Sequence, residues 1–384
     1  MRGTALGLVL VMVLAACGEG EEAATTTVAT ATTVAMATTT TPTTTTLPAI
    51  DGVALAERGP YGVGRTGFET IDSSRDDRPV RVIAFYPALT ESPQPDSEAE
   101  TDSAGAPYPV IVGDGKIGNV LGPHLASHGF VFAAVQGQDT WGATSFNTDM
   151  IDFPLDHMAA LDALESLQDG PLAGLVDTDR AGTTGYSFGG WDALMLTGAR
   201  IDPDHYRATC AERPEGWSDN WWGYVCTPDG RWDRLVERAE QVGIAREDGL
   251  WEPMGDERIK AAMPMGAAGF DFTGPAGLAE ATAAALLIAA SEDLTNDYGP
   301  AMTQLLANYP GAELITFVGA DHMMIYELDA VSQMKRFATA FFGYHLAGED
   351  GYTRYLNEEF VEEEAPDLGD TNSFDTLVWG VAGS

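Results

Sequence analysis

The sequence predicts an α/β fold with a mostly parallel central sheet covered by helices on both faces. Segments with the composition of strands alternate with segments whose apolar residues recur at helical spacing. Several strand segments are continuously apolar, such as AALLIAA at residues 284–290, which is typical of parallel strands buried on both faces. No internal repeat is visible, so we expect one large domain with an insertion.

The expected strands are short apolar runs, most of them ended by glycine, proline or polar residues. In chain order they are Pro79–Tyr86, Tyr108–Val112, Gly129–Val135, Arg180–Gly185, Ile259–Met265, Ala284–Ala290 and Glu313–Val318. The expected helices are a segment ending near Leu125, then Leu155–Leu167, Trp191–Thr197, Ala301–Asn308 and Leu328–Leu346. This alternation is what the connections of a parallel sheet require.

The first 48 residues predict an export signal and a tether. An apolar run, Ala5–Ala16, follows Arg2 and is too short to span a bilayer. Its end, LAAC, resembles the bacterial lipobox, which implies a lipid on Cys17; the alternative is an ordinary signal peptide with an incidental cysteine. The expected organisation is a lipoprotein signal peptide at 1–16, a Thr-rich tether at 17–48, and a folded domain at 49–384 with an insertion at about 201–256. The protein is therefore expected outside the cytoplasm, anchored to the cell membrane by lipid.

The charge of the chain limits its partners. The formal net charge is −38, and the only lysines are Lys116, Lys260 and Lys335. Such an acidic chain argues against nucleic acid as a partner and against electrostatic binding to anionic lipid. Contact with a membrane is thus expected only through the lipid anchor, and the sequence indicates no oligomeric state.

The insertion combines tryptophans with the two remaining cysteines, Cys210 and Cys226. Outside the cytoplasm this pair favours a disulfide over free thiols or a metal site, and no histidine stands at zinc spacing, so no metal is expected. The tryptophans of the segment are Trp217, Trp221, Trp222, Trp232 and Trp251. They have two open interpretations: a lid that binds an apolar acyl or aryl group, or the core of the insertion itself.

The segment TTGYSFGGW contains the pattern G-x-S-x-G around Ser187. Because 43 of 384 residues are glycine, the pattern alone can arise by chance. Here it lies between an expected strand and an expected helix, which is the context of a nucleophile elbow. Gly185 and Gly189 are small enough for the sharp turn, and the N-terminus of the helix favours negative charge. Ser187 is therefore the predicted nucleophile.

A serine hydroxyl needs a base and an oriented acid. His322 lies on a loop just after a late strand, whereas the other histidines lie on or around helices or in the insertion: His124, His128, His157, His205 and His345. Asp293 follows the strand Ala284–Ala290 and is the predicted acid. The alternatives are Glu292, Asp297 and Asp271, while Asp321 stands too near His322 to orient its ring easily. The chain order serine, acid, histidine is that of this kind of site.

An oxyanion hole requires two backbone N–H groups directed at the developing alkoxide. One is expected from Phe188, directly after the nucleophile. The other is expected from Lys116, in the loop Asp114-Gly115-Lys116 that follows the strand Tyr108–Val112.

These motifs resemble the α/β-hydrolase superfamily, in particular bacterial dienelactone-hydrolase-like and platelet-activating-factor-acetylhydrolase-like esterases. The resemblance extends from Gly59 to Leu356, apart from the insertion, and includes GPHLASHGFVFAAV and AFFGYHLAGEDGYTRYL. It also extends to cutinase-like polyester hydrolases. Two positions depart from the family pattern, since Asp114 and Tyr186 stand where relatives have histidine.

The resemblance implies hydrolysis of a carboxylic ester through an acyl-enzyme, without a cofactor, with a small-molecule or lipid ester as the partner. Cutinase-like enzymes carry an aromatic residue after the sixth strand, and here the segment MPMGAAGF has none before Phe270. This observation weakens the polyester interpretation. The alternatives are a binding lipoprotein with a degraded site, and lactone or peptide cleavage.

Overall fold

The structure is a computed structural model, and it describes residues 51–91, 98–137, 148–212, 225–226, 231–296, 298–369 and 372–382. The compact folded unit is Leu47–Ser384. Several expectations lie outside the described residues: those for the signal peptide, Cys17, the tether, Trp217, Trp221, Trp222 and Asp297.

One large mixed sheet forms the centre of the folded unit. Within the described residues it has the strand order β1-β2-β4-β3-β5-β8-β9-β10-β11. The bounds are β1 Gly62–Asp72, β2 Arg78–Ala88, β3 Tyr108–Asp114, β4 Val131–Gln136, β5 Val176–Tyr186, β8 Ile259–Met265, β9 Ala284–Ala290, β10 Glu313–Val318 and β11 Thr376–Val381. The strands from β4 to β10 in this order are parallel, and β1, β2 and β11 add antiparallel edges. The predicted fold class, the α/β-hydrolase fold, is confirmed.

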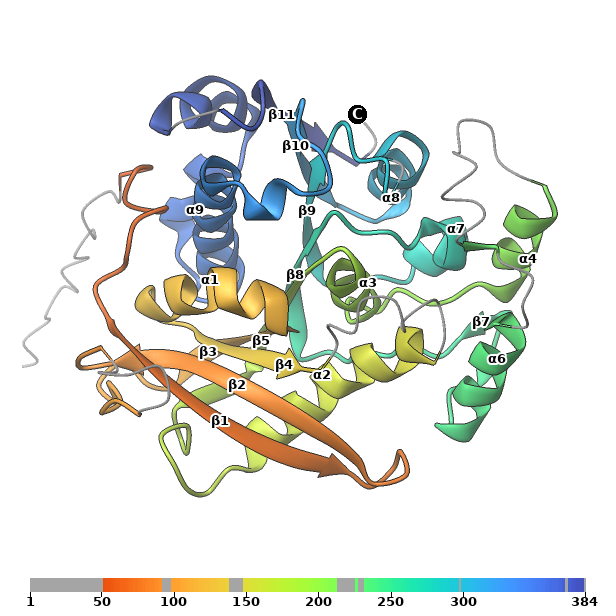
Figure 1. The fold of residues 1–384 in the computed structure, drawn as a ribbon, viewed down its shortest axis with the longest axis horizontal. Coiled ribbons are helices and arrows are strands. Elements are labelled where there is room, and N and C mark those ends of the chain that lie inside the picture. Colours follow the sequence, from red (N-terminus) through yellow and green to blue (C-terminus); the bar gives the residue numbers. More distant parts are fainter. Residues whose placement is uncertain are drawn as a thin grey trace, which may run out of the picture. The chain divides into compact units, whose positions relative to one another are not determined.

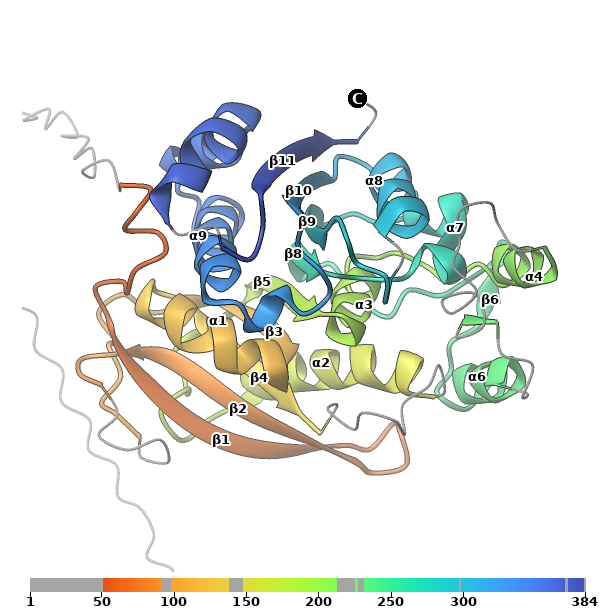
Figure 2. The same ribbon diagram turned by 45° about the horizontal axis from the view of Figure 1, so that its top comes forward.

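Helices cover both faces of this sheet. The main helices are α1 Gly115–Ser127, α2 Asp149–Ser166, α3 Phe188–Met195, α4 Pro203–Ala211, α6 Arg231–Gln241, α7 Phe270–Leu278, α8 Thr303–Asn308 and α9 Leu328–His345. Short helical segments are Tyr298–Met302, Met324–Tyr326, Asp350–Tyr355, Glu359–Glu364 and Ala365–Leu368. Figures 1 and 2 show α1 and α9 on one side of the sheet and α3 and α8 on the other. Among the described helices, none combines the length and apolarity needed to cross a bilayer.

The core explains why the strands read as continuous apolar runs. Along β3, Ile111 packs in one cluster with α1 and α9, whereas Val110 and Val112 pack in another with α2. All three side chains are fully buried. Successive side chains of a strand point to opposite faces, so a sheet covered on both faces requires apolar residues at every position.

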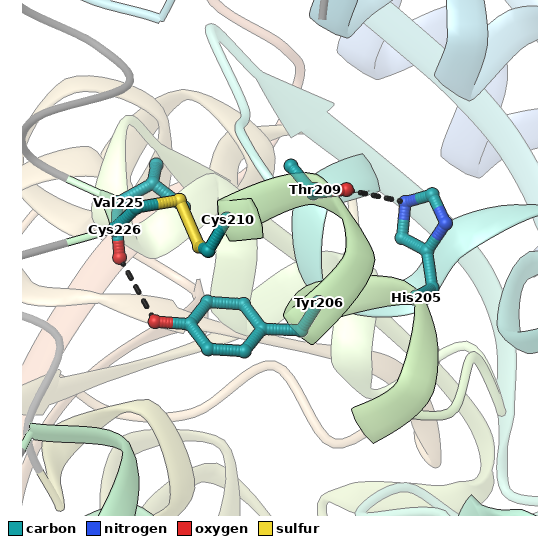
Figure 3. The surroundings of a disulfide bond; sticks show 6 residues. All are labelled: His205, Tyr206, Thr209, Cys210, Val225 and Cys226. Atoms are coloured by element: carbon teal, nitrogen blue, oxygen red, sulfur yellow. Dashed lines mark hydrogen bonds between the residues drawn. A yellow bond between two sulfur atoms is a disulfide. The ribbon is translucent and has the colours of Figure 1, made fainter. Parts of the chain in front are cut away.

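The insertion packs as a module against α7. The structure joins Cys210 and Cys226 in a disulfide, and the hydroxyl of Tyr206 donates to the carbonyl of Val225 at 3.1 Å beside it (Figure 3). The ring of Tyr206 stacks on Trp232 at 4.3 Å and on Phe272 of α7 at 4.9 Å.

The described tryptophans of the insertion belong to this stack. Trp232 continues it onto Trp251, 5.5 Å away between ring centroids. Trp251 is 5% exposed and lies in the two-residue strand pair β6 (Arg246–Glu247) and β7 (Leu250–Trp251). Trp251 lies in a core cluster that also contains Trp191 of α3 and Phe272 of α7, and Trp232 packs against this cluster, so the two tryptophans join the insertion to the rest of the fold.

A buried ionic cluster links the insertion to α2. Arg238 of α6 contacts the carboxylate of Asp152 at 2.8 Å, and the side chains are only 11% and 5% exposed. Arg75, in the turn between β1 and β2, reaches the same carboxylate at 3.4 Å. The hydrogen bond to Asp152 raises the pKa of Arg238. Ion pairs with Asp152 therefore connect α2 both to α6 and to the turn between β1 and β2.

Candidate active site

Ser187 occupies a sharp turn between β5 and α3. Its backbone has φ +60° and ψ −114°, a conformation that non-glycine residues rarely adopt. The turn is fixed on both sides, because the N–H of Ser187 donates to Met265 of β8 at 2.9 Å and its carbonyl accepts from Trp191 at 3.2 Å. Strained backbone of this kind is found where a side chain must project at a defined position.

Two glycines make this turn possible. A Cβ atom at Gly185 would collide with the carbonyl of Gly189, and a Cβ atom at Gly189 would collide with the carboxylate of Asp114. The strand, the helix and the N-terminus of α1 therefore approach one another with no space for a side chain. The sequence prediction that both positions must be small follows from this contact.

The structure brings Ser187, His322 and Asp293 into one hydrogen-bonded chain. The Nε2 atom of His322 lies 2.9 Å from the Oγ atom of Ser187, and its Nδ1 atom lies 2.7 Å from Oδ2 of Asp293. His322 is 7% exposed and Asp293 is 5% exposed, so the hydrogen bond between the imidazole and the carboxylate is shielded from water. The three residues follow the carboxyl ends of β5, β9 and β10.

Asp293 is itself held in place by the backbone that follows it. Its Oδ1 atom accepts from the N–H groups of Thr295 and Asn296 at 2.8 and 2.9 Å, which leaves Oδ2 for His322. The amide of Asn296 in turn donates to the carbonyl of Gly266, just after β8. The backbone therefore orients the carboxylate of Asp293 independently of its bond to His322.

The other candidate acids lie elsewhere. Glu292 is exposed, and its main-chain N–H pairs with Ala320 at 2.9 Å. Asp321 is exposed and its carboxylate accepts from Met323 at 2.7 Å. Asp271 is fully buried in α7. The Nδ1 position of His322 is already taken by Asp293.

The remaining histidines make contacts away from Ser187. His124 bonds Thr339, His128 bonds Glu57, His157 bonds Phe153, His205 bonds Thr209, and His345 packs on Phe341. His322 is therefore the histidine that reaches the serine.

The two expected oxyanion donors, the N–H groups of Phe188 and Lys116, differ in whether they have a hydrogen-bond partner within the protein. Phe188 is the first residue of α3, so its N–H belongs to the first turn, where the helix offers it no internal partner. The N–H of Lys116, however, donates to Oδ1 of Asp114 at 2.8 Å. There is no loop after β3, because α1 begins directly at Gly115. We therefore correct the assignment of Lys116: its N–H belongs to a helix cap and not to the oxyanion hole.

Asp114 has a role that the sequence did not reveal. Its Oδ1 atom caps α1 by accepting from Lys116 and Ile117, and its Oδ2 atom accepts from the N–H of Tyr186 at 3.2 Å. Burial raises the pKa of Asp114, against the opposing effect of the N–H donors of Ile117 and Tyr186. An aspartate directly before a helix is a capping signal, so the cap could have been predicted, but the contact with the elbow could not.

A second buried carboxylate lies one turn further along α3. Asp192 is 1% exposed, and neither of its oxygens hydrogen-bonds a described residue. Burial, followed by the negative charge of Asp114, raises the pKa of Asp192 well above its usual range. The charged form of this side chain is therefore disfavoured in its buried position next to the elbow.

Large apolar side chains are exposed on the loops that carry the acid and the histidine. Leu294 follows Asp293 and is 77% exposed, and Met323 follows His322 and is 50% exposed. Tyr326 and Leu328 continue this exposed set along the chain toward α9. The surroundings of the hydrogen-bonded chain therefore include apolar surface, although the protein as a whole is strongly acidic.

This arrangement can activate a hydroxyl nucleophile. An imidazole bonded to a serine on one side and to a buried carboxylate on the other can accept the serine proton and hold the resulting charge. Among the described residues, no group of three or more His, Cys, Asp or Glu side chains could hold a metal ion.

The fold and the geometry define an α/β-hydrolase fold with a serine at its nucleophile elbow. A sequence model of the family described as PET hydrolase-like matches residues 106–228, about a third of the chain. This stretch includes Ser187, whereas Asp293 and His322 lie beyond its end. No curated protein matches the chain.

Proposed function

We propose that this protein is a serine hydrolase that cleaves carboxylic esters through an acyl-enzyme. The observation that carries the proposal is the hydrogen-bonded chain from Ser187 through His322 to Asp293. The similarity of residues 106–228 to PET hydrolase-like proteins supports the same reaction class.

The reaction proceeds in two halves. Ser187 attacks the ester carbonyl while His322 takes its proton, and Asp293 stabilises the imidazolium that forms. The tetrahedral oxyanion accepts a hydrogen bond from the N–H of Phe188 at the start of α3. Collapse of this intermediate expels the alcohol, which receives the proton from His322. Water, activated by the same imidazole, then releases the acid and restores the serine.

The proposed substrates are uncharged esters with apolar acyl or aryl groups. The exposed apolar side chains around the acid and histidine loops support this class, as does the acidity of the protein, which disfavours anionic substrates. The family match favours an aromatic polyester as one member of the class. Lactone or peptide cleavage would use the same residues on a different acyl group.

A p-nitrophenyl ester series of increasing acyl length tests the proposal, with Ser187→Ala as the control. We expect turnover to fall by about 10⁴-fold or more in the variant, since the nucleophile is removed. Polyester film, assayed by the release of soluble acid, separates the aromatic polyester from short esters. Equal turnover by the Ser187→Ala variant would reject the serine mechanism. Absence of turnover together with failure of a fluorophosphonate probe to label Ser187 would favour a binding protein on a hydrolase scaffold.

We further propose that the protein is held at the cell membrane by a lipid on Cys17. The support is the LAAC sequence after a short apolar run. Cys17→Ser should move the protein from the membrane fraction to the soluble fraction when cells are fractionated. Retention of the variant in the membrane fraction would contradict the lipid anchor.

A further inference from the structure

Tyr186 is the residue before the nucleophile, and it connects two parts of the site. Its backbone N–H donates to Asp114 at the end of β3. Its hydroxyl donates to the main-chain carbonyl of His322 at 2.5 Å, although the two residues are 136 positions apart in the sequence. The ring is 3% exposed, and its centroid lies 5.4 Å from that of the imidazole.

We propose that Tyr186 is a positioning residue for His322. The inference rests on the proposed function and concerns the same site. Through its hydroxyl, Tyr186 fixes the main chain of the histidine loop to β5, the strand that also carries Ser187. The distance between base and nucleophile is then set by one side chain that belongs to the elbow itself.

The neighbouring contacts explain why such a link is needed. The histidine loop is also held by the bond from the N–H of Met324 to Asp321 at 3.1 Å and by that from the N–H of Glu292 to the carbonyl of Ala320 at 2.9 Å, but neither bond joins it to β5. The bond between the imidazole and Ser187 is lost when the serine oxygen becomes an ester, because the hydroxyl proton is then gone. During deacylation the ring is oriented by Asp293 and by the main chain to which Tyr186 is bonded.

The environment of the hydroxyl favours this permanent role as a donor. Burial, followed by the negative charge of Asp293, raises the pKa of Tyr186. The phenol therefore keeps its proton at any pH at which the enzyme would work, and the bond to the His322 carbonyl persists. Tyr186 does not titrate during the reaction; it acts through His322.

Tyr186→Phe tests this role because it removes the hydroxyl and keeps the ring with its packing. Tyr309→Phe is the matched control, since Tyr309 is 1% exposed and its hydroxyl also donates to a backbone carbonyl, that of Ala283 at 2.6 Å. Tyr309 follows α8 and is not part of the site. Both variants lose one buried hydroxyl-to-carbonyl bond, so both should melt at a lower temperature by a similar amount.

The kinetic readout separates positioning from stability. For Tyr186→Phe we expect kcat on a p-nitrophenyl ester to fall about 10-fold or more, with KM changed by no more than about twofold, since misplacement of a catalytic group acts on the chemical steps. The rate of fluorophosphonate labelling should fall with it. Tyr309→Phe should keep both rates. Measurements at a temperature where circular dichroism shows both variants folded give rates per folded molecule.

Two results would overturn the proposal. One is a Tyr186→Phe variant with the same kcat as Tyr309→Phe, which would make the hydroxyl merely structural. The other is a rise in KM with kcat unchanged, which would place Tyr186 in substrate binding. Retained turnover in Ser187→Ala is a separate result, and it would reject the proposed function before this inference is reached.

Discussion

Replacement of Asp114 should weaken both α1 and the nucleophile elbow, by amounts that two variants can separate. Asp114→Ala removes the helix cap, at a cost of about 1 kcal/mol. It also leaves the buried N–H of Tyr186 without its acceptor, which costs about 1–3 kcal/mol. We expect a total loss of about 2–4 kcal/mol. Asp114→Asn keeps an oxygen for the cap but turns an amide N–H₂ toward Tyr186, so it should lose only the second contribution.

Urea denaturation followed by circular dichroism measures these losses, and fluorophosphonate labelling of Ser187 measures the state of the elbow. The matched control is Asp202→Ala, because Asp202 caps α4 by accepting from Asp204 and His205 at 3.0 Å and has no contact with the elbow. The control should lose about 1 kcal/mol and label at the normal rate. If Asp114→Asn equals the unsubstituted protein in both stability and labelling, the reasoning about this carboxylate is wrong.

Two further predictions concern charge. Burial raises the pKa of Glu313 to about 7, so the folded state binds this proton more tightly than the unfolded state, and stability should decrease as the pH rises from about 5 to 8. Glu313→Gln removes the titrating group, so the free energy of unfolding should decrease by about 1–2 kcal/mol less over this pH range in urea titrations. The effect is kept to this size because solvent screens a partly exposed group. An identical pH dependence in the variant would contradict this prediction. Arg238→Met should leave Asp152 with Arg75 alone and destabilise the insertion by about 1–3 kcal/mol. Limited proteolysis should then cut within the insertion sooner while Ser187 still labels, and an unchanged cleavage pattern would refute the link.

The sequence predicts three of the buried strands with their observed bounds, whereas the expected bounds of β3, β4 and β5 differ from the observed ones by up to four residues. The strands β8, β9 and β10 each begin and end where the apolar runs do, because a strand buried on both faces leaves a continuous signal. The edge strand β11 gives no such signal, since Leu377 is the one buried residue of its six. Helix α2 begins at Asp149, whereas the sequence predicts a start at Leu155. The prediction missed the first turn because its acidic residues interrupt the apolar pattern, although acidic residues suit a helix N-terminus.

The positions of Ser187, Asp293 and His322 could be predicted because each follows a strand whose sequence is unambiguous. The contacts of Asp114 and Tyr186 could not, since each depends on a partner distant in the chain. The sequence marks both positions only as departures from a family pattern. The structure shows that both departures form bonds around the elbow, and the expectation for Lys116 failed because Asp114 captures its N–H.

The distance along the chain between Ser187 and His322 has a consequence for protein synthesis. The two residues are 135 positions apart, and His322 follows β10, the last of the parallel strands to be made. A ribosome delivers the serine first, then the carboxylate of Asp293, and the imidazole only after β10 has been added. A nascent chain that has reached β9 therefore carries a serine without a base. Any hydrolytic activity has to wait until nearly the whole polypeptide has been translated, so fragments released early should be chemically inert.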